Sequence, residues 1–423
     1  MERNKGTKAV GIIAEYNPFH NGHLFQLREA KRLSGNSFVI VVMSGSFVQR
    51  GTPAFLDKMS RTKMALENGA DLVVELPVRY ATGSAEFFAA GAVSLLENLG
   101  VVDSLCFGSE HGDTLAMKNI AEFIQKDCDD FNKSVEKFVK SGISYPAARE
   151  KAIIMHCKTI TPNQVREVIS SPNNILGIEY LKALSQYSSS IRPFTVKRAK
   201  SGYHDKELKP DTDTEYSIHS ATAIRTVLEE NGLLKKIQNS VPASVYQLLE
   251  THKGYPVTSA MLSDILYYKL ASSTYEELAS YQDVTLNLAR TIKNCLPQYE
   301  GLEQYILVLK SKQYTYTRIS RCLIHILLNI KKYSLQNMTS QEIAPYARIL
   351  GFRKESSALL KQIKEKAALT MITKMADAKD VLTEDALRML SEDIFATDLY
   401  KHLVFHSFHI KEKNDIQTSP VIL

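Results

Sequence analysis

The chain contains no tryptophan, only five cysteines in 423 residues, and no apolar run of the ~20 residues that a membrane-spanning helix needs. The cysteines are scattered along the sequence without a Cys-x-x-Cys pair: Cys106, Cys128, Cys157, Cys295 and Cys322. Their pattern argues against a disulfide framework and against a cysteine metal cluster. The first seven residues lack the apolar core of a secretion signal. These absences predict a cytoplasmic protein with buried free thiols and no membrane segment.

The charge is modest in total but uneven along the chain. The apolar share of 44% and the charged share of 23% are typical of a globular protein, and the net charge is +6. Residues 301–366 hold 12 Lys and Arg against 4 acidic residues, so this window carries +8 and the rest of the chain −2. A length of 423 residues allows two or three domains.

The first half of the chain alternates apolar, β-branched runs with segments of helical periodicity. Strands are expected at residues 10–14, 37–43, 72–76, 104–107 and 193–199, and helices at 23–33, 60–68, 84–99, 173–186 and 220–230. Runs that are apolar on both faces indicate a parallel sheet covered by helices. We therefore predict a doubly wound α/β fold, with its ligand at the carboxyl ends of the strands.

The strand pattern fades beyond residue 240. Helical spacing of apolar residues recurs at 260–270, 283–294, 317–330 and 356–366. This change predicts a catalytic domain over residues 8–235 and an all-helical domain over residues 240–410. The polar segment 201–216 is expected to form a mobile loop and the tail after Lys411 to be disordered.

The sequence His20-Asn21-Gly22-His23 follows the first strand and opens the first helix. A helix N-terminus offers free backbone N–H groups and a partial positive charge, so it attracts phosphate. A neutral histidine placed there donates a hydrogen bond to an oxyanion. The alternative, half of a zinc site, has no third ligand at suitable spacing nearby. We therefore interpret His20 and His23 as groups that act on the α-phosphate of ATP.

Two further segments supply polar groups. Lys58 and Arg61 are interpreted as phosphate ligands, with a solvated helix face as the equal alternative. The segment Ser217–Arg225 resembles the Ser/Thr-rich turn with a terminal basic residue that accompanies the His-x-Gly-His signature in the nucleotidylyltransferase superfamily.

Over residues 8 to about 400 the chain most closely resembles the tRNA(Met) cytidine acetate ligase family. The segments that carry this resemblance are residues 8–23, Met43–Gly51, Phe107–Glu110, Ser171–Gly177 and Tyr314–Ile319. Residues 1–7 lie outside it. The resemblance implies a Rossmann-like nucleotidylyltransferase domain of the HUP type. It also implies formation of N4-acetylcytidine at the wobble position of elongator tRNA(Met) from ATP and acetate.

The resemblance also implies the binding residues. The catalytic pair is His20 and His23. ATP is expected to contact Ile13, Ala14, Glu15, Tyr16, Asn17, Pro18, Phe19, His20, Asn21, Gly22, His23, Leu24, Phe25, Gln26, Gly108, Asn173 and Arg198. Mg²⁺ is expected only as the counterion of ATP, with no metal site of the protein's own.

Acetate is a poor acyl donor, so we expect it to attack ATP first and form acetyl-AMP, which then acetylates the cytidine amine. Glu15 and His219 are the possible general bases. Basic and aromatic residues alternate from Lys312 to Arg321, which favours an RNA surface for the anticodon region. We expect neither DNA nor a membrane as a partner.

Two alternatives stay open at this stage. The first is another adenylylating enzyme of the superfamily, such as an acetate ligase acting on a carrier-protein thiol or a coenzyme adenylyltransferase. The second is a non-catalytic RNA-binding protein with a degenerate nucleotidyltransferase domain.

Overall fold

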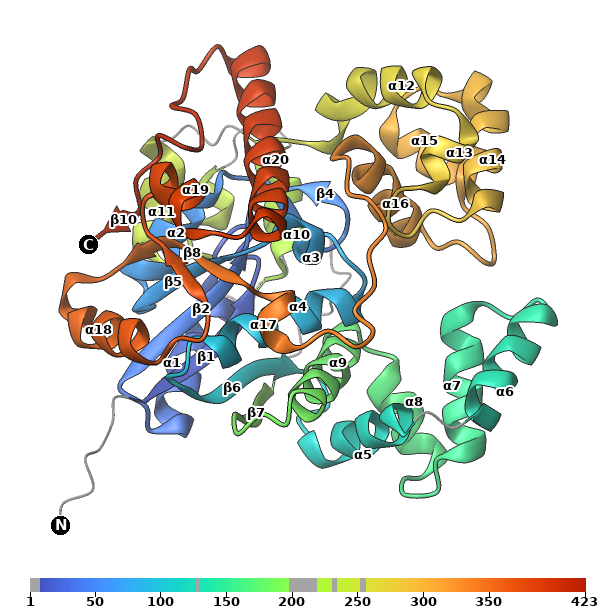
Figure 1. The fold of residues 1–423 in the computed structure, drawn as a ribbon, viewed down its shortest axis with the longest axis horizontal. Helices are drawn as coiled ribbons and strands as arrows, with labels where there is room; N and C mark the ends of the chain where they lie inside the picture. Colours follow the sequence, from blue (N-terminus) through green and yellow to red (C-terminus); the bar gives the residue numbers. More distant parts are fainter. Residues whose placement is uncertain (1–7, 127–128, 198–218, 230–233, 252–255) are drawn as a thin grey trace.

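The computed structural model describes residues 8–423 apart from 127–128, 198–218, 230–233 and 252–255. Its centre is an eight-stranded sheet in this described part, in the order β10-β8-β5-β2-β1-β6-β7, with β9 beside β8 (Figure 1). The strands are β1 (Ala9–Ala14), β2 (Phe38–Ser44), β5 (Leu72–Leu76), β6 (Val102–Ser109), β7 (Arg192–Lys197), β8 (Tyr346–Phe352), β9 (Thr370–Ile372) and β10 (Val421–Ile422). A separate hairpin consists of β3 (Phe47–Val48) and β4 (Thr52–Pro53).

The five strands from β5 to β7 are parallel, which confirms the predicted doubly wound sheet. From β1 the chain moves outward to β2 and β5 on one side, then crosses to β6 and β7 on the other. Strand order therefore reverses between β1 and β6. In open α/β sheets, ligands bind outside the carboxyl ends of the strands at such a point.

Helices cover both faces of the sheet, because its strands are apolar on both sides. One face packs against α4 and α9, and the other against α1, α2, α10 and α11. The helices of this half are α1 (Asn21–Ser34), α2 (Lys58–Glu67), α3 (Val78–Ala81), α4 (Ala85–Asn98), α5 (Thr114–Gln125), α6 (Asp129–Lys140), α7 (Tyr145–His156), α8 (Pro162–Ile169), α9 (Pro172–Gln186), α10 (Ala221–Glu229) and α11 (Ala243–Thr251). Helices α5 to α8 form a lobe at the lower right in the view of Figure 1.

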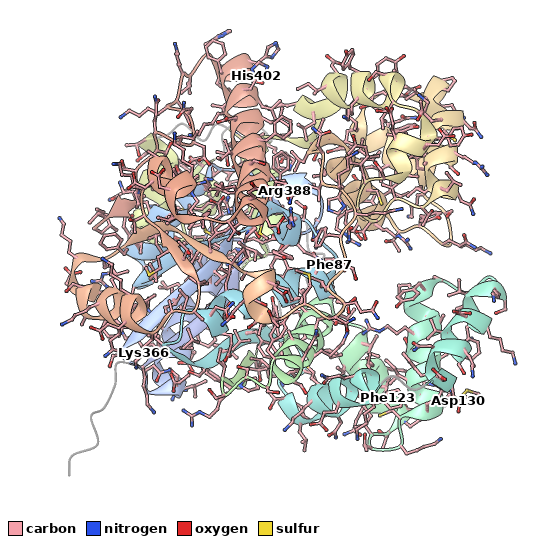
Figure 2. All side chains as sticks on the ribbon, viewed as in Figure 1. Phe87, Phe123, Asp130, Lys366, Arg388 and His402 are labelled. Atoms are coloured by element: carbon pink, nitrogen blue, oxygen red, sulfur yellow. The ribbon has the colours of Figure 1, made fainter. Side chains whose placement is uncertain are left out.

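A second lobe is a bundle of short helices, whose hydrophobic core also includes Phe47 of β3, Val78 of α3 and residues between Ala396 and Val404 (Figure 1). Its helices are α12 (Ser263–Ser272), α13 (Tyr275–Ala279), α14 (Leu286–Cys295), α15 (Leu302–Leu309) and α16 (Tyr316–Leu327). The connection from this bundle back to the sheet passes α4, where the Tyr333 ring packs edge-on against Phe87, labelled in Figure 2. No helix in the described part of the chain is long and apolar enough to cross a membrane.

The region after residue 240 is largely helical, as predicted, but the expectation of an all-helical domain without strands is wrong. Residues 346–352 form β8, which pairs with β5 antiparallel, and residues 370–372 form β9, which pairs with β8. The remaining helices are α17 (Ser340–Ile343), α18 (Ser357–Lys366), α19 (Ala378–Val381) and α20 (Glu384–Phe408). A seven-residue, mostly apolar run that includes Arg348 shows no period that separates a buried strand from a helix, and its partner strand lies more than 270 positions away in the sequence.

The tail after Lys411 is also ordered, contrary to the prediction. Strand β10 pairs with β8, and Asp415 is completely buried. The tail is polar in sequence, and the partners that order it come from distant parts of the chain.

Candidate active site

The turn between β1 and α1 presents the two histidines. Tyr16 has a φ of +47°, a backbone conformation that non-glycine residues rarely adopt. Its ring is buried and packs against Phe19 and His23, with centroid distances of 4.7 and 4.9 Å. Buried aromatic packing therefore holds the turn in an otherwise unfavourable shape.

His20 and His23 cap helix α1 reciprocally. Nδ1 of His20 accepts a hydrogen bond from the Gly22 amide at 3.1 Å, and Nδ1 of His23 accepts one from the His20 amide at 3.3 Å. The two rings are stacked, with centroids 3.7 Å apart. Because each Nδ1 is an acceptor, the proton of each neutral ring lies on Nε2. The pair thus offers Nε2–H donors beside a helix N-terminus, an arrangement suited to a phosphate oxyanion.

A cleft opens in front of this pair at the carboxyl ends of β1 and β6. It is lined by Ile13, Ala14, Glu15, Asn17, His20, His23, Gln26, Val48, Gln49, Arg50, Thr52, Phe88, Phe107, Gly108, Asn173, Leu176, Tyr180, Ser220, Ala221, Thr222 and Arg225. The N-terminal ends of α1, α9 and α10 all border it. Three helix N-termini add partial positive charge to the same space, which favours an anionic ligand.

Helix α9 is attached to the end of β6 by side-chain hydrogen bonds. The Ser109 hydroxyl donates to Oδ1 of Asn174 at 2.7 Å, and Nδ2 of Asn173 donates to Oε1 of Glu110. Asn173 and Gly108, which lie more than 60 positions apart, consequently face the same cleft.

The second motif meets the first through Arg225. Its Nη1 donates to the carbonyl oxygen of Asn17 at 2.7 Å, and Ser220 caps α10 by accepting the Ala223 amide at 3.1 Å. The Ser217–Arg225 segment and the turn before His20 are about 200 positions apart in the sequence, yet Arg225 and Asn17 are in direct contact in the structure. Ser217 and Ile218 lie outside the described residues, as does the segment 201–216.

The structure brings together nine of the predicted ATP contacts. These are Ile13, Ala14, Glu15, Asn17, His20, His23, Gln26, Gly108 and Asn173. Seven of the other predicted contacts do not line the cleft. Three of them are buried, namely Tyr16, Pro18 and Phe19, and Asn21 donates to the Asn239 carbonyl oxygen. Gly22 and Leu24 are partly exposed on α1, and Phe25 is exposed. Arg198 lies outside the described residues. Of the two possible bases, Glu15 lines the cleft, and His219 contacts the Ser240 hydroxyl at 2.9 Å.

Sequence reasoning did not assign the β3–β4 hairpin, which lines the cleft with Val48, Gln49, Arg50 and Thr52. Arg50 adds a cation to the lining of the cleft that also contains the histidines. The signal was available, since the Gly- and Ser-containing run Ser44–Gly51 follows a buried strand at its carboxyl end.

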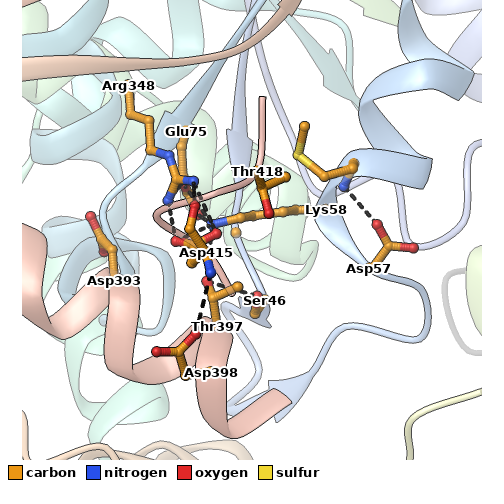
Figure 3. A network of polar contacts seen from close by, with 12 residues as sticks. Ser46, Asp57, Lys58, Glu75, Arg348, Asp393, Thr397, Asp398, Asp415 and Thr418 are labelled. Atoms are coloured by element: carbon orange, nitrogen blue, oxygen red, sulfur yellow. Dashed lines mark hydrogen bonds and ion pairs between the residues drawn. The ribbon is translucent and has the colours of Figure 1, made fainter. Parts of the chain in front are cut away.

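The interpretation of Lys58 and Arg61 as phosphate ligands is wrong, because both side chains are buried. Arg61 donates to the carbonyl oxygens of Leu56, Glu15 and Ser44 at 3.0, 2.7 and 2.9 Å. Nζ of Lys58 lies 2.9 Å from Oε1 of Glu75 and also contacts Asp415 (Figure 3). Arg61 therefore holds together the loops that follow β1 and β2, behind the cleft.

Comparisons with known proteins place the chain in a family. The HIGH nucleotidyl transferase family model matches residues 7–415. Proteins named tRNA(Met) cytidine acetate ligase from Alkaliphilus metalliredigens and Thermoanaerobacter sp. (strain X514) are 39% and 41% identical to this chain. The first alignment covers 98% of both chains, and the second covers 92% of this chain and 94% of the relative.

Solved structures give the same result. Thermotoga maritima TmcAL bound with alpha-thio ATP is 30% identical, with a TM-score of 0.88 over 98% of this chain and 99% of that one. Its apo form has a TM-score of 0.91 at the same identity and coverage. Family model, relatives and structures span nearly the whole chain, so the chain belongs to the tRNA(Met) cytidine acetate ligases of the HIGH nucleotidyl transferase family.

Proposed function

We propose that this enzyme joins acetate to N4 of the wobble cytidine of elongator tRNA(Met), with ATP as the energy source. The observation that carries the proposal is the stacked His20–His23 pair, which faces a cleft bordered by three helix N-termini. The solved relative with alpha-thio ATP supports ATP as a substrate, and the names of the relatives support acetate and tRNA(Met).

In the first step, an acetate oxygen attacks the α-phosphorus of ATP, and the bond to the pyrophosphate oxygen breaks. Acetyl-AMP forms and pyrophosphate leaves. Negative charge develops on the equatorial oxygens of the α-phosphoryl group. The Nε2–H groups of His20 and His23 are suited to stabilise that charge, and Arg50 and Arg225 add cations to the cleft.

In the second step, the N4 amine of cytidine attacks the acetyl carbon, and the bond between that carbon and the AMP oxygen breaks. AMP leaves, and N4 loses a proton. Glu15 is the better-placed base because it lines the cleft, with Oε1 held by the Gln49 amide at 2.9 Å. A base in an anticodon loop can be turned into such a pocket without opening a duplex.

Mg²⁺ is expected as a companion of ATP. An ion that enters with ATP would be held by the phosphates, where it would neutralise part of their charge. Among the residues described, no group of three His, Cys, Asp or Glu side chains is placed to hold a metal ion.

The bundle is our proposed surface for the tRNA anticodon region. Its exposed tyrosines include Tyr267, Tyr268, Tyr275 and Tyr316. The Arg318 guanidinium lies 5.0 Å from the ring centre of Tyr314, and that of Arg290 lies 5.4 Å from that of Tyr275. Cations beside aromatic rings suit a single-stranded RNA, since they pair with phosphates while the rings stack on bases.

The test is to incubate the enzyme with ATP, labelled acetate and bulk tRNA, then digest the tRNA and identify acetylated cytidine. We expect the His23→Ala variant to lose the label and keep tRNA binding. The His406→Ala variant, which changes an exposed histidine on α20, should retain the activity. Adenylate formation with another acceptor and no label in tRNA would refute the proposal. Binding of tRNA without adenylate would favour a degenerate RNA-binding protein.

A further inference from the structure

The β3–β4 hairpin is fixed to the cleft at its tip. The Gln49 amide donates to Oε1 of Glu15 at 2.9 Å, and the Gln49 side chain donates to the Gly83 carbonyl oxygen at 3.5 Å. Val48, Gln49 and Arg50 line the cleft. Any movement of the hairpin therefore moves groups that face the substrates.

The back of this hairpin lies directly against helix α16 of the bundle. Gly51 has a φ of +75°, and a Cβ added to it would lie 2.5 Å from the Arg321 amide nitrogen and 2.7 Å from the Ser320 carbonyl carbon. The Ser320 hydroxyl donates to the Gly51 carbonyl oxygen at 2.7 Å, and both groups are buried. Only a residue without a side chain permits so close an approach between these two backbones.

A second contact lies little more than one helical turn further along α16. Nε2 of His325, which is completely buried, is 3.0 Å from the Thr82 carbonyl oxygen, and its Nδ1 is 3.1 Å from the Gln282 carbonyl oxygen. The residue after Thr82 is Gly83, which accepts the Gln49 side chain. Helix α16 thus contacts the hairpin two positions after Gln49 and the residue before Gly83, which is the hydrogen-bond partner of Gln49.

The N-terminal end of α16 lies at the tyrosine and arginine cluster of the proposed RNA surface. Thr315 caps the helix, and Arg318, which stacks on Tyr314, lies only two positions before Ser320. One rigid helix therefore runs from the RNA surface to the hairpin at the ATP cleft.

We propose that Gly51 and Ser320 are positioning residues, which keep the bundle in register with the cleft so that the bound tRNA meets the acetyl-adenylate. The seam formed by these two residues acts on the transfer step, and the inference rests on the proposed function. In Gly51→Ala, ordinary van der Waals contact requires the two backbones to separate by about 1 Å. A displacement of that size can lower a rate by roughly 100-fold when reacting groups must be aligned.

Three measurements separate positioning from general damage. They are acetate-dependent ATP–pyrophosphate exchange without tRNA, the dissociation constant for tRNA, and single-turnover acetyl transfer from preformed enzyme-bound adenylate. For Gly51→Ala we expect transfer to fall roughly 10- to 100-fold, with exchange and tRNA affinity within about threefold of the wild type. Gly35→Ala is the matched control, because Gly35 has a φ of +64° but no atom within 4 Å of an added Cβ.

Ser320→Ala tests the seam without overpacking if Gly51→Ala does not fold. It should slow transfer selectively, and Ser320→Thr, which keeps the hydroxyl donor, should restore part of the rate. Equal losses in exchange and transfer, or no loss in either, would overturn the positioning role. A wild-type enzyme without acetate-dependent exchange or without tRNA acetylation would instead refute the proposed function.

Discussion

Replacing Asp415 by asparagine should destabilise the fold, because Asp415 balances charge in a closed ionic cluster. Lys58 and Arg348 supply two cations, and Glu75 and Asp415 supply two carboxylates (Figure 3). Oδ1 of Asp415 lies 3.1 Å from Nζ of Lys58 and 2.9 Å from Nη2 of Arg348. Burial alone would raise the pKa of Asp415, but the two cations outweigh it and lower that pKa to about 2.

The asparagine keeps the shape of the side chain and removes its charge, so two buried cations share one carboxylate. Breaking a buried ion pair in this way costs about 3–5 kcal/mol. Urea unfolding followed by far-ultraviolet circular dichroism measures the loss. With a slope of about 3 kcal/mol per molar urea, we expect the midpoint to fall by about 1 M or more.

Two controls decide whether the cluster is the cause. Asp385→Asn removes a carboxylate from the same C-terminal region, but its side chain is 86% exposed and its loss should change stability by at most about 0.5 kcal/mol. Adding Lys58→Met to Asp415→Asn restores the charge balance, so the double variant should be more stable than the sum of the single effects predicts. A free energy of unfolding for Asp415→Asn within about 1 kcal/mol of the wild type would contradict the reasoning.

Three other variants test separate parts of the structure. Glu15→Gln keeps an acceptor for the Gln49 amide but removes the proposed base, so single-turnover acetyl transfer should fall while acetate-dependent exchange persists. In Arg61→Lys, the lysine cannot reach all the carbonyl oxygens to which Arg61 donates, so both the stability to urea and the rate of ATP–pyrophosphate exchange should decrease. An unchanged exchange rate would show that the loops joined by Arg61 do not affect the cleft. Burial and the charge of Glu75 raise the pKa of Asp393 to about 7, so its stabilising effect is complete below about pH 4 and is lost as pH rises through 7. Asp393→Asn should flatten the dependence of the unfolding free energy on pH between about pH 4 and 7. An unchanged pH dependence would show that Asp393 does not titrate in this range.

Local sequence determined much of the nucleotide-binding half. Apolar runs and helical spacing gave the strands of the parallel sheet and the helices between them, because those periods report which faces are buried. The His20–His23 motif could be placed at a strand-to-helix turn for the same reason. What it binds could be predicted from the chemistry of a helix N-terminus.

Tertiary structure alone decided which distant side chains meet. Lys58 and Arg61 lie on α2, and the sequence of this helix allows both side chains to be either exposed or buried. Only their contacts with Asp415 and with the Ser44 carbonyl oxygen show that they are internal. Strand β8 depends on pairing with β5, so its seven residues carried no signal of their own. Periodicity records the burial of a segment, whereas ion pairs and strand neighbours depend on contacts between segments that are separate in the sequence, by 17 residues for Lys58 and Glu75 and by more than 300 for Lys58 and Asp415. For that reason the motifs could be predicted from the sequence, and the seam between bundle and cleft could not.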